Sequence, residues 1–172
     1  MAKILIYNNQ NNRMETYYKG EEEAMPYNNG TLKVKEFRGS SKSNNFRTLY
    51  GRPIYVGFAF KRCWEGGHGL QSQHYAGVAF DVGQNLDGNG RNYMRVLAKN
   101  SGYWRYVEPA SLTPRWVHFD NRWIASGYPL TQSGSRGIYV LIAQDALNTL
   151  GQQTGGLDGI FGSRTRQAVI NF

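Results

Sequence analysis

The chain has 172 residues, of which 40% are hydrophobic, and its 20 Lys and Arg against 12 Asp and Glu give a formal charge of +8. This length allows one domain, or one domain with a small second unit, and the composition excludes a disordered or fibrous protein. The positive charge predicts an anionic partner, such as nucleic acid, an anionic membrane or a cell wall that carries teichoic acid. Because the Lys and Arg occur in ones and twos and not in the runs that follow a phosphate backbone, we expect no nucleic-acid binding.

The first 45 residues contain two expected strands. Residues 3–7 form a short apolar strand and residues 31–37 a second one, with a solvated acidic patch at 21–23 between them and a Ser- and Asn-rich loop at 39–45. The apolar stretch at 3–7 is too short for a signal-peptide core or a membrane span. If the protein acts outside the membrane, we therefore expect release by lysis or through a phage-type pore.

The central part alternates short strands with one helix. We expect strands at 54–60, 78–82, 103–107 and 116–120, and a helix at 93–99 that Gly102 ends. Strands from separated parts of the chain with one or two helices against them make an α+β fold. The single cysteine, Cys63, excludes an internal disulfide and a Cys-rich zinc knuckle, and we expect a half-buried thiol.

The composition changes after Trp123, where glycine, serine and proline become frequent. We expect a boundary there, with one domain at 1–125 and a helical module at 126–172. A helix ends at Gly151, and a last helix begins with Ser163 as N-cap and has Ala168, Val169 and Phe172 on its apolar face. The core of this module is too small to stand far from its neighbour.

Two of the central strands carry candidate metal ligands. Strand alternation puts Asp81 on the face opposite Phe80 and Val82, and Gly77 lets the chain bend so that His74 can approach Asp81. His118 is free to join them, since it lies opposite Val117 and Phe119 in its own strand. Two imidazoles and one carboxylate make a three-ligand site with an open position, the arrangement that one catalytic Zn²⁺ ion uses. By themselves these residues leave two alternatives open, a zinc site or hydrogen-bonded polar residues, and the zinc assignment comes from the resemblance described next.

The residue pattern of these segments resembles the motifs of a known family. Ser72-x-His74-x-x-Gly77-x-Ala79-x-Asp81 matches the motif of the zinc D-Ala-D-Ala carboxypeptidases and L-alanyl-D-glutamate endopeptidases, and Trp116-Val117-His118-Phe119-Asp120 is similar to their second motif. The wider group includes lysostaphin and the hedgehog signalling domain. The resemblance implies a small, mainly antiparallel sheet with flanking helices, zinc ligands at His74, Asp81 and His118, and hydrolysis of peptide bonds in bacterial peptidoglycan. A non-catalytic peptidoglycan-binding protein that retains the zinc site, and a zinc-free interaction domain, are the alternatives.

The general base departs from the family pattern. Relatives carry Glu or Asp three residues before the last histidine, where this chain has Arg115. Asp120 and Glu108 are the candidates for the base, and Asp120 could instead accept a hydrogen bond from an imidazole N–H. Arg62 resembles the arginine that serves the substrate carboxylate or oxyanion in related peptidases, with Arg38 as a weaker option. His68 lies outside the motif, and we expect it to be exposed.

The last 46 residues resemble a second family. Asp158-Gly159-x-Phe161-Gly162-x-x-Thr165 is similar to the core of the three-helix peptidoglycan-binding domain found on many wall hydrolases. Phe161 is expected to fill the small core, with Gly159 and Gly162 in a tight turn and Thr165 at the start of the last helix. The resemblance implies peptidoglycan as the partner and action at the bacterial cell wall. We expect a monomer without a membrane span.

Overall fold

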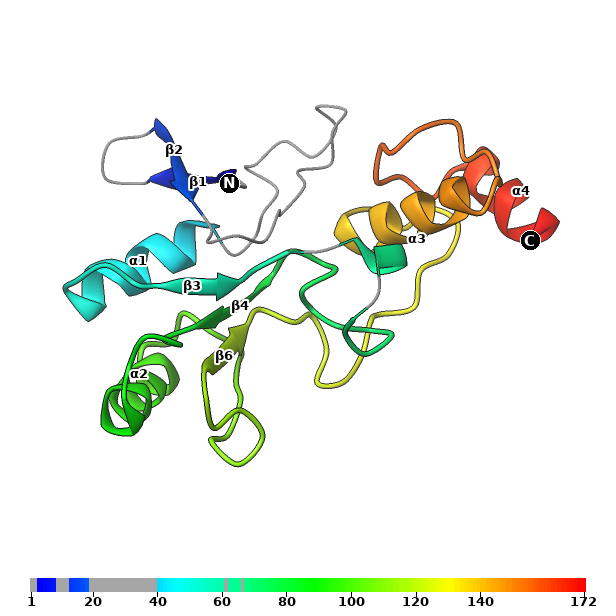
Figure 1. The fold of residues 1–172 in the computed structure, drawn as a ribbon. Helices are drawn as coiled ribbons and strands as arrows, with labels where there is room; N and C mark the ends of the chain where they lie inside the picture. Colours follow the sequence, from blue (N-terminus) through cyan, green and yellow to red (C-terminus); the bar gives the residue numbers. More distant parts are fainter. Residues whose placement is uncertain (1–2, 9–12, 19–39, 61, 66) are drawn as a thin grey trace.

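The computed structural model describes residues 3–8, 13–18, 40–60, 62–65 and 67–172 (Figure 1). Strands β1 (Lys3–Asn8) and β2 (Arg13–Tyr18) form an antiparallel hairpin in which Lys3 pairs with Tyr18 and Asn8 with Arg13. The strand expected at 3–7 is thus confirmed, whereas β2 was not predicted. The expected strand at 31–37, the acidic patch at 21–23 and Arg38 lie outside the described residues.

Helix α1 (Ser40–Tyr50) replaces most of the loop that was expected at 39–45. That prediction was wrong from Ser40 onward, because it rested on the low helix propensity of Ser and Asn. Phe46 is 0% exposed and Tyr50 is 7% exposed. Burial of these two rings, which lie one helical turn apart, outweighs the weak local preference.

A four-stranded antiparallel sheet forms the centre of the molecule and confirms the α+β fold. Its strands are β3 (Val56–Phe58), β4 (Ala79–Val82), β5 (Tyr106–Val107) and β6 (Val117–Asp120), in the order β3-β4-β6-β5. The strands at 54–60 and 103–107 are shorter than expected, whereas those near 78–82 and 116–120 agree within one residue.

The two faces of the sheet have different roles. One face packs on the main core, which joins α1, α2 and the sheet and contains Phe46, Tyr50, Ala59, Phe80, Val82, Met94, Ala98, Trp104, Val117 and Phe119. Trp104 stacks on Phe119 with ring centroids 4.1 Å apart. The opposite face is left for the polar residues that alternate with this apolar set. Val78 precedes the strand and packs elsewhere, against Ile142.

Helix α2 (Gly88–Asn100) begins five residues before the helix expected at 93–99. Asp87 is its N-cap, and the Asp87 carboxylate accepts a 2.7 Å hydrogen bond from the Gly90 amide. This cap compensates for the two glycines in the first turn, which have low helix propensity. Met94 and Ala98 attach α2 to the core.

The segment after residue 126 contains two helices, α3 (Ile138–Thr149) and α4 (Ser163–Asn171), where a three-helix module was expected. Gly151 follows α3 with φ 84°, which fits the expected end of the helix. The N-cap of α4 is Gly162, one residue before the expected Ser163. Phe161 is buried as predicted.

The expected apolar face of α4 is only partly correct. Ala168 is 2% exposed, but Val169 is 47% exposed and Phe172 is 77% exposed. α4 packs against α3, and this contact covers Ala168 but not the other two side chains. The apolar face predicted from helical spacing is therefore wider than the part of α4 that is buried against α3.

Helix α3 packs against the short 3-10 helix η2 (Cys63–Glu65) and the turn before β4, while Figure 1 shows α2 at the other end of the sheet. Ile142 contacts Ala76 and Val78 in a second buried cluster, and the Trp64 indole N–H donates to Asp145 over 3.1 Å. The C-terminal helices thus lie directly against the central part of the chain, and the boundary between 125 and 126 stays a prediction. None of the described helices is both long and apolar enough to cross a lipid bilayer.

Candidate metal centre

Pairing between strands places three polar residues in a row across the face of the sheet that lies opposite the main core. Asp81 on β4 pairs with His118 on β6. On the other side of β6, Tyr106 pairs with Asp120 and Val107 with Phe119, and the Glu108 amide donates to the His118 carbonyl over 2.9 Å. The same register therefore sets Glu108 opposite His118. Residues paired across antiparallel strands point to the same face, so Asp81, His118 and Glu108 are neighbours there.

His74 reaches this row from the turn that precedes β4. Gly77 has φ 65°, and its amide donates to the His74 carbonyl over 3.0 Å, which closes the turn. The His74 Nδ1 lies 3.0 Å from the Ala59 carbonyl oxygen, and because a carbonyl only accepts, Nδ1 carries the proton. The other ring nitrogen, Nε2, lies 3.3 Å from the Asp81 Oδ2.

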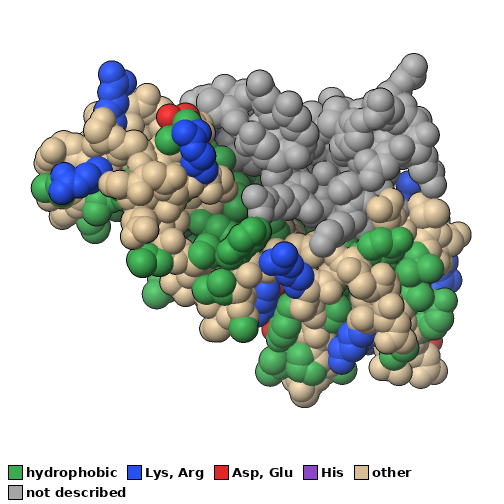
Figure 2. Space-filling model, turned by 180° about the vertical axis from the view of Figure 1, so that it is seen from behind, with side chains coloured by type: hydrophobic (Ala, Val, Ile, Leu, Met, Phe, Trp, Pro, Cys, Tyr) green, Lys and Arg blue, Asp and Glu red, His purple; other side chains and the backbone are tan. Residues whose placement is uncertain are grey.

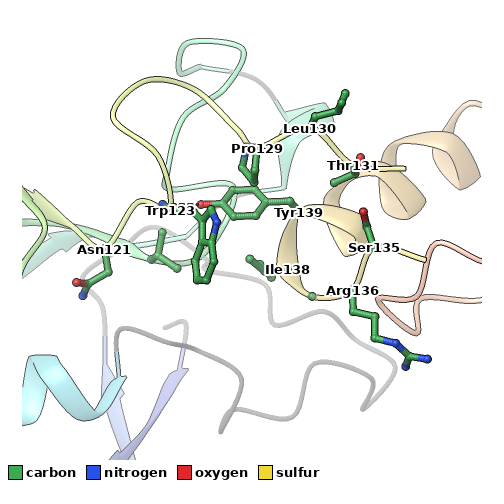
Figure 3. Close-up of a pocket in the computed structure, with 11 residues that line it drawn as sticks. Asn121, Trp123, Pro129, Leu130, Thr131, Ser135, Arg136, Ile138 and Tyr139 are labelled. Atoms are coloured by element: carbon green, nitrogen blue, oxygen red, sulfur yellow. Dashed lines mark hydrogen bonds between the residues drawn. The ribbon is translucent and has the colours of Figure 1, made fainter. Parts of the chain in front are cut away.

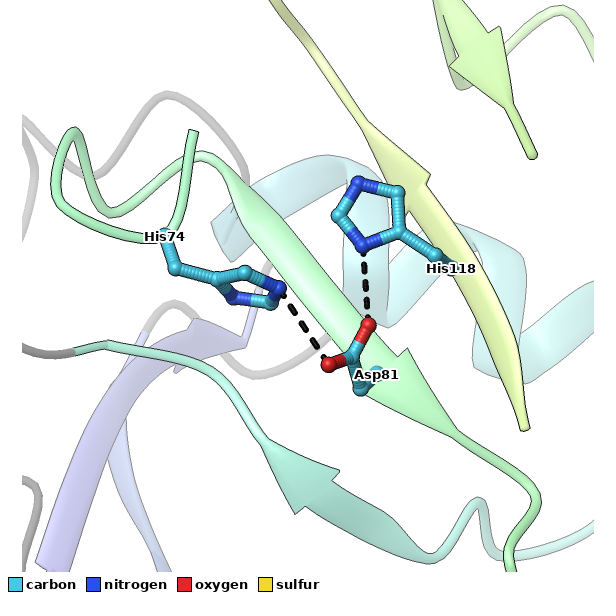
Figure 4. Close-up of side chains that lie close together, drawn as sticks. All are labelled: His74, Asp81 and His118. Carbon is cyan, nitrogen blue, oxygen red and sulfur yellow. Dashed lines mark hydrogen bonds and ion pairs between the residues drawn. The ribbon is translucent and has the colours of Figure 1, made fainter. Parts of the chain in front are cut away.

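His118 lies between two carboxylates. Its Nδ1 is 2.8 Å from the Asp81 Oδ1, and its Nε2 is 3.0 Å from the Asp120 Oδ2. One ligand atom from each of His74, Asp81 and His118 lies within 4.8 Å of the others, and Figure 4 shows both rings directed at the Asp81 carboxylate. The structure thus brings together the three residues that the sequence predicted as ligands.

The electrostatics of the cluster favour a bound cation. Burial opposes a charge on His118, but hydrogen bonds to Asp120 and Asp81 outweigh it and raise its pKa to about 9. Burial alone would raise the pKa of Asp81, yet hydrogen bonds from His118 and His74 hold it well below its usual value. Two imidazoles and one carboxylate are donors that suit zinc and related divalent ions, so these residues could hold a metal.

Asp120 lies on the Nε2 side of His118, away from Asp81. Its side chain is 0% exposed and accepts hydrogen bonds from Arg122 through the backbone amide at 3.0 Å, Nε at 2.9 Å and a terminal nitrogen at 2.6 Å. Burial acts against its charge, but these hydrogen bonds keep the pKa of Asp120 below its usual value. This environment fits the alternative role given above, in which Asp120 accepts a hydrogen bond from the His118 ring and fixes its orientation, since the carboxylate oxygens already bond Arg122 and His118.

The predicted arginine does not reach the cluster. Arg62 lies 3.8 Å from Asp145 on α3 and over the Trp64 ring, at the contact with the C-terminal helices. A pocket, here called the metal pocket, lies above His74, Asp81 and His118. Within the described residues, Arg122 is the Lys or Arg side chain that lines it. Its guanidinium lies 3.7 Å from the centroid of the Tyr106 ring. Arg122 was not predicted from the sequence, because its placement depends on the turn after β6 and no motif contains it.

The pocket above the ligands has a volume of about 470 Å³, and Glu108, Trp116 and Ser126 line its walls. His68 lines it too, although it was expected to be exposed. The His68 ring is 4.9 Å from that of His74 and 4.5 Å from that of Phe58, and the Tyr75 hydroxyl bonds the His68 backbone. The glycine-rich sequence around His68 gave no sign of this position.

Residues 136–172 match the model of a family described as a putative peptidoglycan binding domain. The match covers α3, α4 and the turn between them, and it indicates association with the bacterial cell wall and peptidoglycan as a partner. No curated protein and no solved structure matches the chain.

Proposed function

We propose that the chain is a zinc-dependent peptidase that hydrolyses peptide bonds in bacterial peptidoglycan. The observation that supports this most is the convergence of His74, Asp81 and His118 at the floor of an open pocket. A divalent ion held there supplies Lewis acidity toward a peptide carbonyl and toward water. The peptidoglycan-binding match at 136–172 supports the choice of substrate.

Glu108 is the general base in this proposal. It lines the metal pocket, and its amide donates to the His118 carbonyl where the register of β5 and β6 continues past Val107. The Cβ atoms of residues that lie opposite each other in this way are about 5 Å apart. A carboxylate at that position can take a proton from the attacking water and pass it to the leaving amine. Relatives carry an acidic base at the position of Arg115, and Glu108 takes over the role of that base here. Arg115 itself is exposed and is absent from the lining of the pocket.

Arg122 and Asp120 support the chemistry from the other side of His118. The guanidinium of Arg122 lines the pocket, and only part of its donor set is used by Asp120 and the Ala125 carbonyl. Its remaining N–H groups are suited to a substrate carboxylate. Asp120 fixes the ring orientation of His118, so it acts as a positioning residue.

The test is digestion of purified sacculi by the zinc-loaded chain, with mass spectrometry of the released peptides. We expect Glu108→Gln to keep one bound zinc and to lower the rate of peptide release about 100-fold or more. The matched control is Asp87→Asn, which alters an exposed carboxylate at the start of α2 and should leave the rate unchanged. Unchanged release by Glu108→Gln would contradict its role.

A second candidate is a non-catalytic wall-binding protein that retains the metal site. Arg115 is the observation that favours it, since it stands where relatives carry the acidic base. In that case the zinc-loaded chain would bind sacculi without releasing any peptide. The same digestion experiment separates the two functions.

A further inference from the structure

A second pocket lies on the other side of the loop that borders the metal pocket. The loop 121–131 carries Arg122, Ser126 and Gly127 into the lining of the metal pocket. The same loop carries Asn121, Trp123 and Pro129–Thr131 into the second pocket, which has a volume of about 250 Å³. Residues of this one loop therefore take part in both pockets.

One side of the second pocket is aromatic. Trp123, which is 53% exposed, and Tyr139 both line it (Figure 3). The Tyr139 hydroxyl accepts a 3.3 Å hydrogen bond from the Trp123 backbone amide and donates over 3.2 Å to Gln73, the neighbour of His74. These hydrogen bonds fix the Tyr139 side chain and the backbone at Trp123, and they connect this side of the pocket to the turn that holds a candidate metal ligand.

The other side of the pocket is polar. Thr131 and Ser135 provide hydroxyl groups. Arg136, at the start of the segment that matches the peptidoglycan-binding family, also lines the pocket, and Figure 3 shows its guanidinium directed away from Trp123 and Tyr139. Asn121 adds an amide at the end next to Trp123. A flat ring facing hydrogen-bonding groups suits a sugar, whose C–H face packs on an aromatic side chain while its hydroxyl and acetamido groups bond the polar edge.

We propose that this pocket binds one N-acetylated amino sugar of the peptidoglycan glycan strand. The inference rests on the proposed function, because it assigns the saccharide part of the same substrate. The volume of about 250 Å³ lies below the ~300–1,000 Å³ of pockets for drug-sized ligands, so we assign a single sugar ring to it. A peptide attached to that sugar crosses the loop 121–131 to reach the metal pocket.

The test uses a ligand that contains no peptide. The full chain, without added zinc, is titrated with the N-acetylglucosamine trimer and followed by NMR chemical shifts, with the glucose trimer as the matched ligand that lacks acetamido groups. We expect saturable binding of the first trimer and binding at least tenfold weaker for the second. The shifts should concentrate at Trp123, Ser135 and Tyr139.

Two variants make the assignment specific. Trp123→Ala should weaken binding of the N-acetylglucosamine trimer at least tenfold, and Ser135→Ala should weaken it to a smaller degree. Tyr55→Ala removes an aromatic ring of similar exposure, 47%, outside the pocket and should bind like the unaltered chain.

Equal binding of both trimers, equal loss in Tyr55→Ala, or no saturable binding would overturn the proposal. Because zinc and hydrolysis play no part in the titration, a failed peptidase assay leaves this result intact. Conversely, if the chain releases peptides but does not bind the sugar trimer, the sugar-site proposal is overturned and the proposed peptidase function stands.

Discussion

At the scale of single residues, the protonation of His118 links the cluster to metal binding. Its two ring nitrogens face Asp81 and Asp120, and without a metal the imidazolium is the cation that these carboxylates stabilise. A metal at the same place must displace the proton on Nδ1, whereas the proton on Nε2 can remain directed at Asp120. Metal and proton therefore compete for one nitrogen.

This competition predicts a pH dependence. Because the pKa of His118 is raised from 6.5 to about 9 in the fold, the metal-free chain is stabilised below pH 6.5 and loses that stabilisation, up to about 3 kcal/mol, as the pH rises through 9. The apparent affinity for zinc should rise about tenfold per pH unit over the same range. Chelator competition at pH 6.5, 7.5 and 8.5 measures the affinity, and urea unfolding of the chelator-treated chain measures the stability. A flat profile in both would contradict the geometry at His118.

The three ligands could be predicted from the sequence because they lie in two motifs that resemble those of a known zinc family, and because local alternation fixes the face that each takes. Alternation within β4 and β6 fixes the face of Asp81 and His118, and Gly77 allows the turn that returns His74. Arg62 could not be placed, since its partner Asp145 is 83 residues away in sequence and meets it only when α3 packs on η2. The register of β5 against β6, which sets Glu108 beside His118, is also a tertiary feature.

At the scale of elements, helix ends depend on single capping groups. α2 begins with Gly88, Asn89 and Gly90, a sequence of low helix propensity, and the Asp87 carboxylate satisfies one of the free amides of the first turn. α1 likewise starts in a Ser- and Asn-rich segment and is held by Phe46 and Tyr50. Sequence patterns found the apolar centre of α2 but not its start, because the start depends on a cap and not on periodicity.

Asp87→Ala should therefore lower the free energy of unfolding by about 1 kcal/mol. Asp87→Asn keeps a capping oxygen and should lie within a few tenths of a kcal/mol of the unaltered chain. Urea denaturation monitored by circular dichroism compares the two. Equal stability of both variants would show that the first turn of α2 does not depend on the cap. Zinc stoichiometry serves as the control, since Asp87 lies outside the ligand cluster.

At the scale of the whole molecule, the C-terminal helices and the sheet form one packed body. Ile142 is buried against Ala76 and Val78, which adjoin the turn carrying His74, and Tyr139 bonds Gln73 in the same turn. The sequence predicted that the small helical module would stay close to its neighbour, on the ground that its own core is small. It could not predict the contact surface, since the residues that form it lie more than 60 positions apart.

This packing predicts that the metal site and the C-terminal helices unfold together. Ile142→Ala leaves a cavity beneath the turn that holds His74 and should cost about 2–4 kcal/mol, in a single transition seen equally by circular dichroism and by release of bound zinc. The matched control is Val169→Ala on the exposed side of α4, where the side chain is 47% exposed and the cost should stay near 0.5 kcal/mol. Two separate transitions, with zinc retained after α3 and α4 have unfolded, would show that the contact between the two parts is not cooperative. A single transition means that the segment matching the peptidoglycan-binding family and the ligand cluster proposed to hold the metal depend on the same folded core, since α3 is part of that segment and packs against the turn that carries His74.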